Sequence, residues 1–156
     1  MKYYKRLQVY KNSTGTLTYD PLIKEARSYN WYVIARKIGP YMVLNNYCYS
    51  RTTIKHFYKI RKQISDTFTQ IHFEIEAPRG LQDLDAAESL LKKRIQDLKD
   101  KINRKGSHKK TNANRMQMIS YWEAKLAEVN YIIDAERREA FEAQFTEQLE
   151  EILEHE

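Results

Sequence analysis

The residues with the clearest chemical potential are four cations at helical spacing, Arg51, Lys55, Lys59 and Lys62. At about 100° per residue their side chains lie within about 80° of one another on a helix. Such a row can follow a phosphate backbone, because each cation can neutralise one phosphate. The ordinary solvated face of an amphipathic helix would carry the same row. Both interpretations stay open at the level of sequence.

Hydroxyl side chains stand at the predicted start of this helix. Ser50 is a favoured N-cap residue, and Thr52 and Thr53 follow it in the first turn. A helix N-terminus presents unpaired N–H groups and a partial positive charge, so this junction could seat an anion. A well-capped junction without a ligand is the competing interpretation.

A second basic cluster occupies the polar segment 103–112, which contains Gly106 and is predicted to be a loop. Its lysines are Lys105, Lys109 and Lys110. A basic tip on a rigid arm could enter a groove of nucleic acid or an acidic pocket. A loop that needs charge only for solubility would look the same.

The third pattern is apolar and comprises Phe141, Phe145, Leu149 and Ile152. Steps of four, four and three residues place these side chains on one face of a helix. The charged residues 136–139 separate this stripe from the apolar positions that precede it. The stripe therefore needs a partner of its own, either the N-terminal part of the chain or the same stripe of a second copy.

Patterns typical of enzymes are missing from the sequence. The four histidines lie far apart, and the chain has no zinc-ligand spacing, phosphate-binding glycine loop, dinucleotide fingerprint or nucleophile elbow. Cys48 and His56 could form a nucleophile and base, but a buried strand cysteine is the favoured interpretation. Glu74 and Glu76 share one face of a strand, yet two carboxylates make a weak metal site. The sequence predicts no catalytic residue, no metal and no cofactor.

The hydrophobic pattern predicts an α+β fold in which a small antiparallel sheet and two helices occupy residues 1–78. Strands are predicted at 2–10, 31–38, 41–44 and 69–76, and helices at 20–29 and 51–65. The first of these two helices, 20–29, is predicted because Asp20 can cap it and Pro21 takes the first helical position.

The apolar pattern of residues 79–156 predicts a long antiparallel helical hairpin that resembles a coiled coil. It consists of a helix at about 81–104, a basic loop at 105–111 and a helix at about 112–154. The first helix has an apolar seam of Leu81, Leu84, Ala87, Leu91, Ile95, Leu98 and Ile102, and the second has Ile119, Trp122, Leu126, Val129 and Ile133. The second helix must extend well beyond the first, because it is much longer.

Composition narrows the class of protein. The 156 residues are 42% hydrophobic and 31% charged, with no apolar run long enough to span a bilayer. The basic start lacks the apolar segment of a signal peptide, and the single cysteine suits a reducing cytoplasm. The net charge is +6, and the chain is basic up to about residue 125 and acidic beyond it. These features predict a cytoplasmic protein with no membrane contact.

The segment 45–56, NNYCYSRTTIKH, resembles one found in small uncharacterised proteins of tailed bacteriophages. There a strand precedes a Tyr-Ser-x-Thr-Thr-x-Lys-His run that opens a helix, and the matching positions here begin at Tyr49 and end at His56. The resemblance implies a phage origin and no known activity.

Taken together, these patterns favour a non-enzymatic phage accessory protein that binds a host or defence nucleic acid or nucleoprotein stoichiometrically, with counter-defence as one setting. The basic row, the hydroxyl junction and the basic tip would make the contact. A protein–protein module that oligomerises through the 141–152 stripe is the first alternative. An enzyme of unrecognised type is the second.

Overall fold

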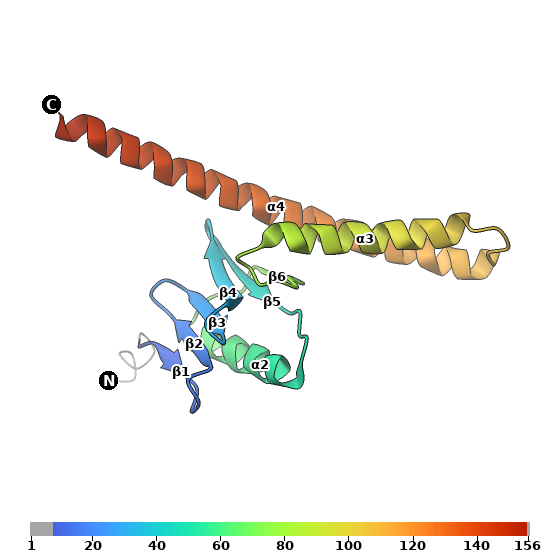
Figure 1. Ribbon diagram of the computed structural model, residues 1–156, viewed down its shortest axis with the longest axis horizontal. Coiled ribbons are helices and arrows are strands. Elements are labelled where there is room, and N and C mark those ends of the chain that lie inside the picture. The colour runs from blue at the N-terminus through green and yellow to red at the C-terminus, as the bar shows by residue number, and fades with distance from the viewer. Residues whose placement is uncertain (1–7, 156) are drawn as a thin grey trace.

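A computed structural model describes residues 8–155 and has a six-stranded sheet covered by helices on both faces (Figure 1). The strands are β1 (Tyr10–Lys11), β2 (Leu17–Asp20), β3 (Glu25–Ser28), β4 (Tyr32–Ile38), β5 (Tyr41–Asn45) and β6 (Phe73–Ile75). They lie in the sheet in the order of the sequence, and every neighbouring pair except β5–β6 is antiparallel. The predicted α+β class is confirmed.

The hairpin predicted from residues 31–46 is present as β4 and β5. Ile38 pairs with Tyr41, so the turn between the strands consists of Gly39 and Pro40. Gly39 has φ of 58°, a left-handed conformation that glycine adopts without steric cost. The strand predicted at 2–10 lies mostly outside the described residues, and its last residue begins β1.

The helix predicted at 20–29 is wrong, because this segment forms a second hairpin from β2 and β3. The Asp20 carboxylate accepts a hydrogen bond from the Leu22 N–H at 3.0 Å, so Asp20 shapes a turn instead of capping a helix. Lys24, at φ 54°, closes the turn in the left-handed region. An aspartate followed by proline favours both structures, and the pairing of Asp20 with Glu25 selects the turn.

The strand predicted at 69–76 is shorter than expected and is the parallel exception in the sheet. β6 pairs with β5 in the parallel direction, with Val43 opposite Phe73. Parallel neighbours need a crossover, which is supplied here by α2 (Arg51–Asp66).

The two faces of the sheet carry separate cores. One face packs against α2 through Phe57, Ile60 and Ile64. The opposite face packs against α3 (Leu84–Asn103) and α4 (Lys109–Glu154), through residues such as Leu91 and Ile132. The base of the C-terminal helices is therefore part of the fold's core, and α2 lies on the other side of the sheet.

The helices α3 and α4 lie side by side over the length of α3 (Figure 1). α3 begins at Leu84, three residues later than predicted, because the Asp83 carboxylate caps it by accepting from the Ala86 N–H. α4 begins at Lys109, earlier than predicted, with His108 as its N-cap. The coiled-coil character of the pair stays a prediction.

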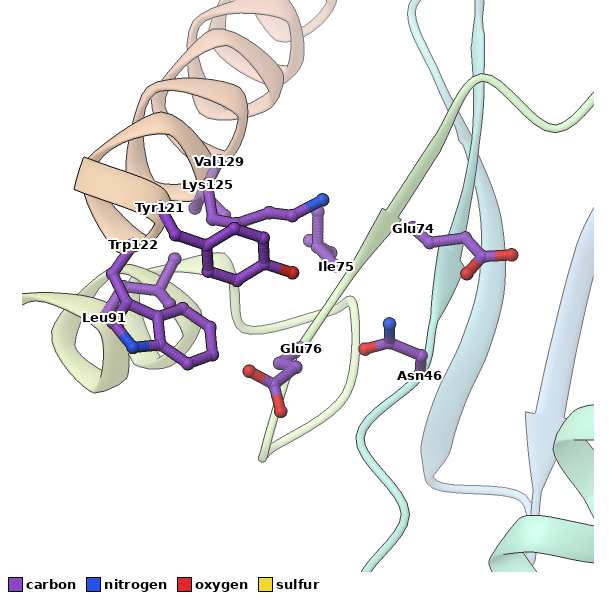
Figure 2. A pocket seen from close by; sticks show the side chains of 9 residues that line it. All are labelled: Asn46, Glu74, Ile75, Glu76, Leu91, Tyr121, Trp122, Lys125 and Val129. Carbon is purple, nitrogen blue, oxygen red and sulfur yellow. The ribbon is translucent and has the colours of Figure 1, made fainter. Parts of the chain in front are cut away.

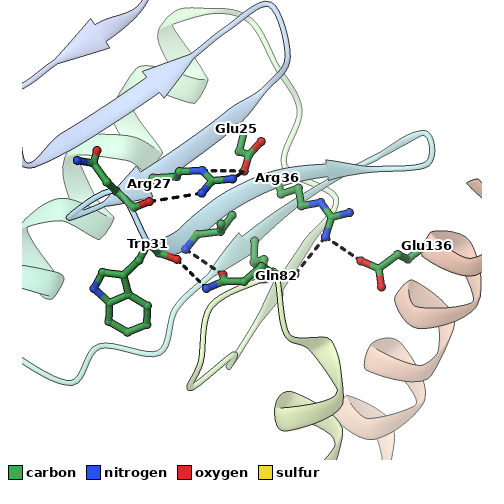
Figure 3. Close-up of polar contacts among 9 residues, drawn as sticks. Glu25, Arg27, Trp31, Arg36, Gln82 and Glu136 are labelled. Atoms are coloured by element: carbon green, nitrogen blue, oxygen red, sulfur yellow. Dashed lines mark hydrogen bonds and ion pairs between the residues drawn. The ribbon is translucent and has the colours of Figure 1, made fainter. Parts of the chain in front are cut away.

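Polar contacts fix the sheet to these helices (Figure 3). The Gln82 side chain accepts from the Val33 N–H at 3.2 Å and donates to the Trp31 carbonyl at 2.7 Å. The Arg36 guanidinium donates to the Leu81 carbonyl and pairs with the Glu136 carboxylate on α4 at 2.7 Å. The segment before α3 and the middle of α4 are thus both tied to β4.

Beyond this attachment α4 continues without a break to Glu154, for 46 residues in all. Its C-terminal part projects away from the sheet (Figure 1), and residues 137–155 are exposed throughout. Within residues 8–155, no helix is both long and apolar enough to cross a membrane.

Candidate nucleic-acid interface

The candidate interface is the outer face of α2, and the inner face of the helix fixes its orientation. Ser50 caps α2 by accepting a hydrogen bond from the Thr53 N–H at 3.1 Å. Phe57, Ile60 and Ile64 are buried against the sheet. Because one face is held in the core, the outward direction of the remaining side chains is determined.

The structure places all four predicted cations of α2 on the exposed face, namely Arg51, Lys55, Lys59 and Lys62. Among the described residues, none of these four forms an ion pair. Arg61, on the edge of the same helix, pairs with Glu74 at 3.3 Å and is thereby neutralised. The four cations form the cationic row, in which no side chain pairs with a carboxylate of the described residues.

Two residues that the sequence analysis did not assign to this surface belong to it. Tyr58 is 63% exposed and Ile54 is 43% exposed. At about 100° per residue, Tyr58 lies within about 20° of Arg51 around the helix. The same helical spacing that identified the cations could have identified Tyr58. The face therefore combines cations with an exposed aromatic ring.

The hydroxyl side chains at the start of α2 are used mainly within the protein. The Ser50 and Thr53 hydroxyls lie 2.8 Å apart, and Thr53 is buried. Thr52 alone of the three predicted hydroxyl residues points outward without a side-chain hydrogen bond among the described residues. The geometry favours the capped junction over a hydroxyl-lined anion seat.

Behind the row lies a buried histidine that sequence analysis weighed only as a base for Cys48. The His56 ring is buried, with Nδ1 at 2.6 Å from the Ser28 hydroxyl. Its burial lowers its pKa, and the positive charge of Lys59 lowers it further. His56 therefore joins α2 to the sheet as a neutral side chain.

Cys48 is half-buried in the segment between β5 and α2, not in a strand as expected. Burial raises the pKa of its thiol, which disfavours the thiolate that a nucleophile requires.

The basic tip lies at the far end of the α3–α4 pair (Figure 1). Lys105 is in the turn between the helices, whereas Lys109 and Lys110 occupy the first turn of α4 and are exposed. A shallow cavity of about 300 Å³ lies there, bordered by cations including Lys101, Arg104 and Arg115. Because α2 and the tip lie on different parts of the molecule, the fold does not bring the two predicted basic sites together.

The predicted apolar stripe is fully formed and uncovered. Phe141, Phe145, Leu149 and Ile152 are all exposed, and neighbouring Leu153 is exposed as well. Of the two partners considered for the stripe, residues 8–78 of the same chain do not cover it, since α4 carries these side chains away from the sheet.

A pocket of about 340 Å³ lies between β6 and the α3–α4 pair (Figure 2). Glu74 and Glu76 border it, but Glu74 pairs with Arg61 and Glu76 pairs with Arg94. The Arg94 guanidinium also lies 4.7 Å from the centre of the Trp122 ring. Each carboxylate thus has its own arginine partner, which disfavours a shared metal ion.

Across residues 8–155, no three side chains of the histidine, cysteine, aspartate and glutamate types gather closely enough to hold a metal. No protein-family model matches the chain, and comparisons with curated proteins and with solved structures return no match either.

Proposed function

We propose that the protein binds a nucleic acid or nucleoprotein stoichiometrically, without catalysis, through the cationic row of α2. The observation that supports this proposal best is the exposure of Arg51, Lys55, Lys59 and Lys62 without carboxylate partners in the described part of the chain. Some arginines elsewhere, such as Arg36 and Arg94, are paired with glutamates, whereas the row presents four cations along one helix face that are unpaired within residues 8–155. The contrast favours a ligand that supplies negative charge from outside.

The length of the row suits a phosphate backbone. From Arg51 to Lys62 the helix rises about 16 Å, a distance over which one strand of a duplex presents several phosphates. Tyr58 adds a ring on which an unpaired base could stack. An acidic protein surface could attract the same cations, but it would make less use of the exposed ring.

The basic tip provides a secondary contact in this proposal through Lys105, Lys109 and Lys110. The resemblance of residues 45–56 to phage proteins supports an accessory role in the cytoplasm of an infected bacterium, directed at host or defence machinery. Inhibition of a defence nucleoprotein would require only binding, consistent with a protein in which we expect no catalytic residues.

The decisive experiment is a titration against random-sequence double-stranded and single-stranded DNA at two salt concentrations. Four phosphate contacts on duplex DNA should give a log–log slope of about −3 to −4 between affinity and salt concentration. The double variant Lys55→Glu/Lys59→Glu should lose at least ten-fold in affinity, because it reverses two contacts and repels the backbone.

The matched control is Lys37→Glu/Lys93→Glu, which changes the net charge equally. Both of its positions are exposed, and they lie on β4 and α3, away from the row. The control should lose much less affinity than the α2 variant. The proposal is wrong if the unmodified protein does not bind at low salt, or if both variants lose affinity equally.

The exposed stripe of α4 favours a second candidate function, a protein–protein module that self-associates through residues 141–152. It is compatible with the first, because the stripe and α2 occupy separate parts of the molecule (Figure 1).

A further inference from the structure

The unpartnered stripe of α4 is too extensive to be an ordinary scatter of surface residues. Phe141 is 67% exposed, Phe145 53%, Leu149 44% and Ile152 58%. Together they form one apolar surface along residues 137–155, which are all exposed. Contiguous exposed patches of this kind mark interaction sites.

A matching apolar groove lies at the other end of the same helix, near the basic tip. It has a volume of about 360 Å³ and is lined by Ile102, Met116 and Ile119, with Lys99, Asn103 and Ser120 at its margin. Met116 is 61% exposed although it is apolar. The groove is therefore a second apolar surface without a partner among the described residues.

The two surfaces have opposite charge. Residues 137–155 contain two arginines and six glutamates, a net charge of −4. Residues 99–115 contain seven lysines and arginines and one aspartate, a net charge of +6. Packing the stripe on the stripe of another copy would bring two acidic segments together, whereas packing it on the groove pairs acid with base.

The two surfaces also share one face of α4. At about 100° per residue, Met116, Phe141, Phe145 and Ile152 lie within about 40° of one another around the helix axis. They cannot meet within one chain, because about 43 Å of continuous helix separates Met116 from Phe145. The stripe can reach such a groove only on another molecule.

We propose that the acidic stripe of α4 docks into the basic apolar groove of a second copy, and that the exchange is reciprocal. The two α4 helices then run antiparallel about a two-fold axis near Ile132, which places Leu149 against Met116 of the other copy and Phe145 against its Ile119. Near the axis Ile132 faces the sheet, whereas Asn130 and Asp134 are exposed and mark the side of α4 along which the second helix can pass.

This inference names the surface used by the self-association candidate and rests on that candidate. It does not depend on nucleic-acid binding. In the dimer the apolar stripe of each copy is buried against the apolar groove of the other copy, and the acidic helix lies beside basic residues. One symmetric contact therefore buries both exposed apolar surfaces.

The test is a mass measurement by light scattering over a range of protein concentrations, with the full chain. The unmodified protein should be a dimer that dissociates on dilution. Phe145→Ser and Met116→Glu should each raise the dissociation constant at least ten-fold, because each change damages both reciprocal contacts. The matched controls are Ala143→Ser, on the opposite side of α4 from the stripe, and Met118→Glu, an exposed methionine outside the groove.

Cysteine crosslinking separates the groove from stripe-on-stripe packing. In a Cys48→Ser background, mixing chains that carry Leu149→Cys with chains that carry Met116→Cys should give a disulfide-linked pair. Leu149→Cys alone should not crosslink to itself.

The inference is overturned if the protein is a monomer at every concentration, if Met116→Glu dimerises normally, or if Leu149→Cys crosslinks to itself. Titration of DNA with the same variants shows whether the function proposed for α2 survives independently.

Discussion

The helix α2 and the last half of α4 are both amphipathic, but folding leaves opposite faces of them free. In α2, Phe57, Ile60 and Ile64 are covered by the sheet and the cationic row remains exposed. Residues 137–155 are exposed throughout, although the Gly39 N–H donates to the Glu139 carboxylate, and the apolar stripe remains exposed. The face that folding leaves uncovered determines the partner a helix can accept.

This difference explains why the two surfaces are assigned to different ligands. Exposed cations bind phosphates by counterion release, which weakens with salt. An apolar stripe binds by removing its surface from water, which depends little on salt. A loss of DNA affinity at high salt should therefore be attributed to α2. The α4 contact should weaken with salt only through the pairing of its acidic stripe with the basic groove, because its apolar part does not depend on charge.

The largest expected effect on stability comes from truncating a buried apolar side chain of α2, and the comparison is with an exposed apolar side chain of α4. Ile60→Ala should lower the free energy of unfolding by about 2–5 kcal/mol, because Ile60 is fully buried and its loss leaves a cavity. Phe145→Ala should change it by less than about 0.5 kcal/mol, since Phe145 is exposed in the single chain. Urea unfolding at concentrations where the protein is monomeric measures both values.

A large loss of stability in monomeric Phe145→Ala would contradict the comparison. It would mean that the stripe packs on its own chain in solution. An equally small loss in Ile60→Ala would mean that α2 is not anchored as the structure places it.

The sequence was sufficient to predict most of the fold because its strongest patterns are local. Helical periodicity located α2 and the α3–α4 pair, and the Gly39–Pro40 turn located the β4–β5 hairpin. The β2–β3 hairpin was missed, since Asp20 and Pro21 favour a helix start and a turn alike. The packing of the base of α3 and α4 on the sheet was also missed. Periodicity shows that one face of a helix is buried, but it does not show which element covers that face.

The candidate site was predictable to a similar degree. The helical spacing of the four cations was enough to group them on one face of α2. The separation of the tip from α2 depends on tertiary arrangement, which no local pattern contains. The groove formed by Ile102, Met116 and Ile119 was missed for the same reason, because two of these residues had been counted in the apolar seams.

A smaller effect is expected from the cap of α2. Ser50→Ala should lower the free energy of unfolding by about 1 kcal/mol, because the Thr53 N–H loses its acceptor. Ser65→Ala near the other end of the helix is the matched control, since its hydroxyl only donates to the Arg61 carbonyl and is exposed. Equal losses in the two variants would argue against a capping role for Ser50. They would also argue against Arg51, the first cation of the row, as the first residue of α2.

The smallest expected effect is a dependence of folding stability on pH, which arises from His56 on the buried side of α2. Because burial lowers the pKa of His56, the unfolded chain binds more protons at this residue than the folded chain does as pH falls through about 6.5. The contribution of neutral His56 to stability is therefore fully present above that pH and decreases below it. Residues 137–155 of α4 are exposed throughout and hold no counterpart of this buried histidine.

Urea unfolding at pH 7.5, 6.5 and 5.5 should show a steeper loss of stability in the unmodified protein than in His56→Gln. The comparison uses the slope with pH, so any uniform loss caused by the substitution cancels. Lys59 adds to the cost of protonation by its positive charge, and Lys59→Gln should make the slope slightly shallower while leaving the core intact. Parallel curves for the unmodified protein and His56→Gln would show that α2 is not held against the sheet by a buried neutral histidine.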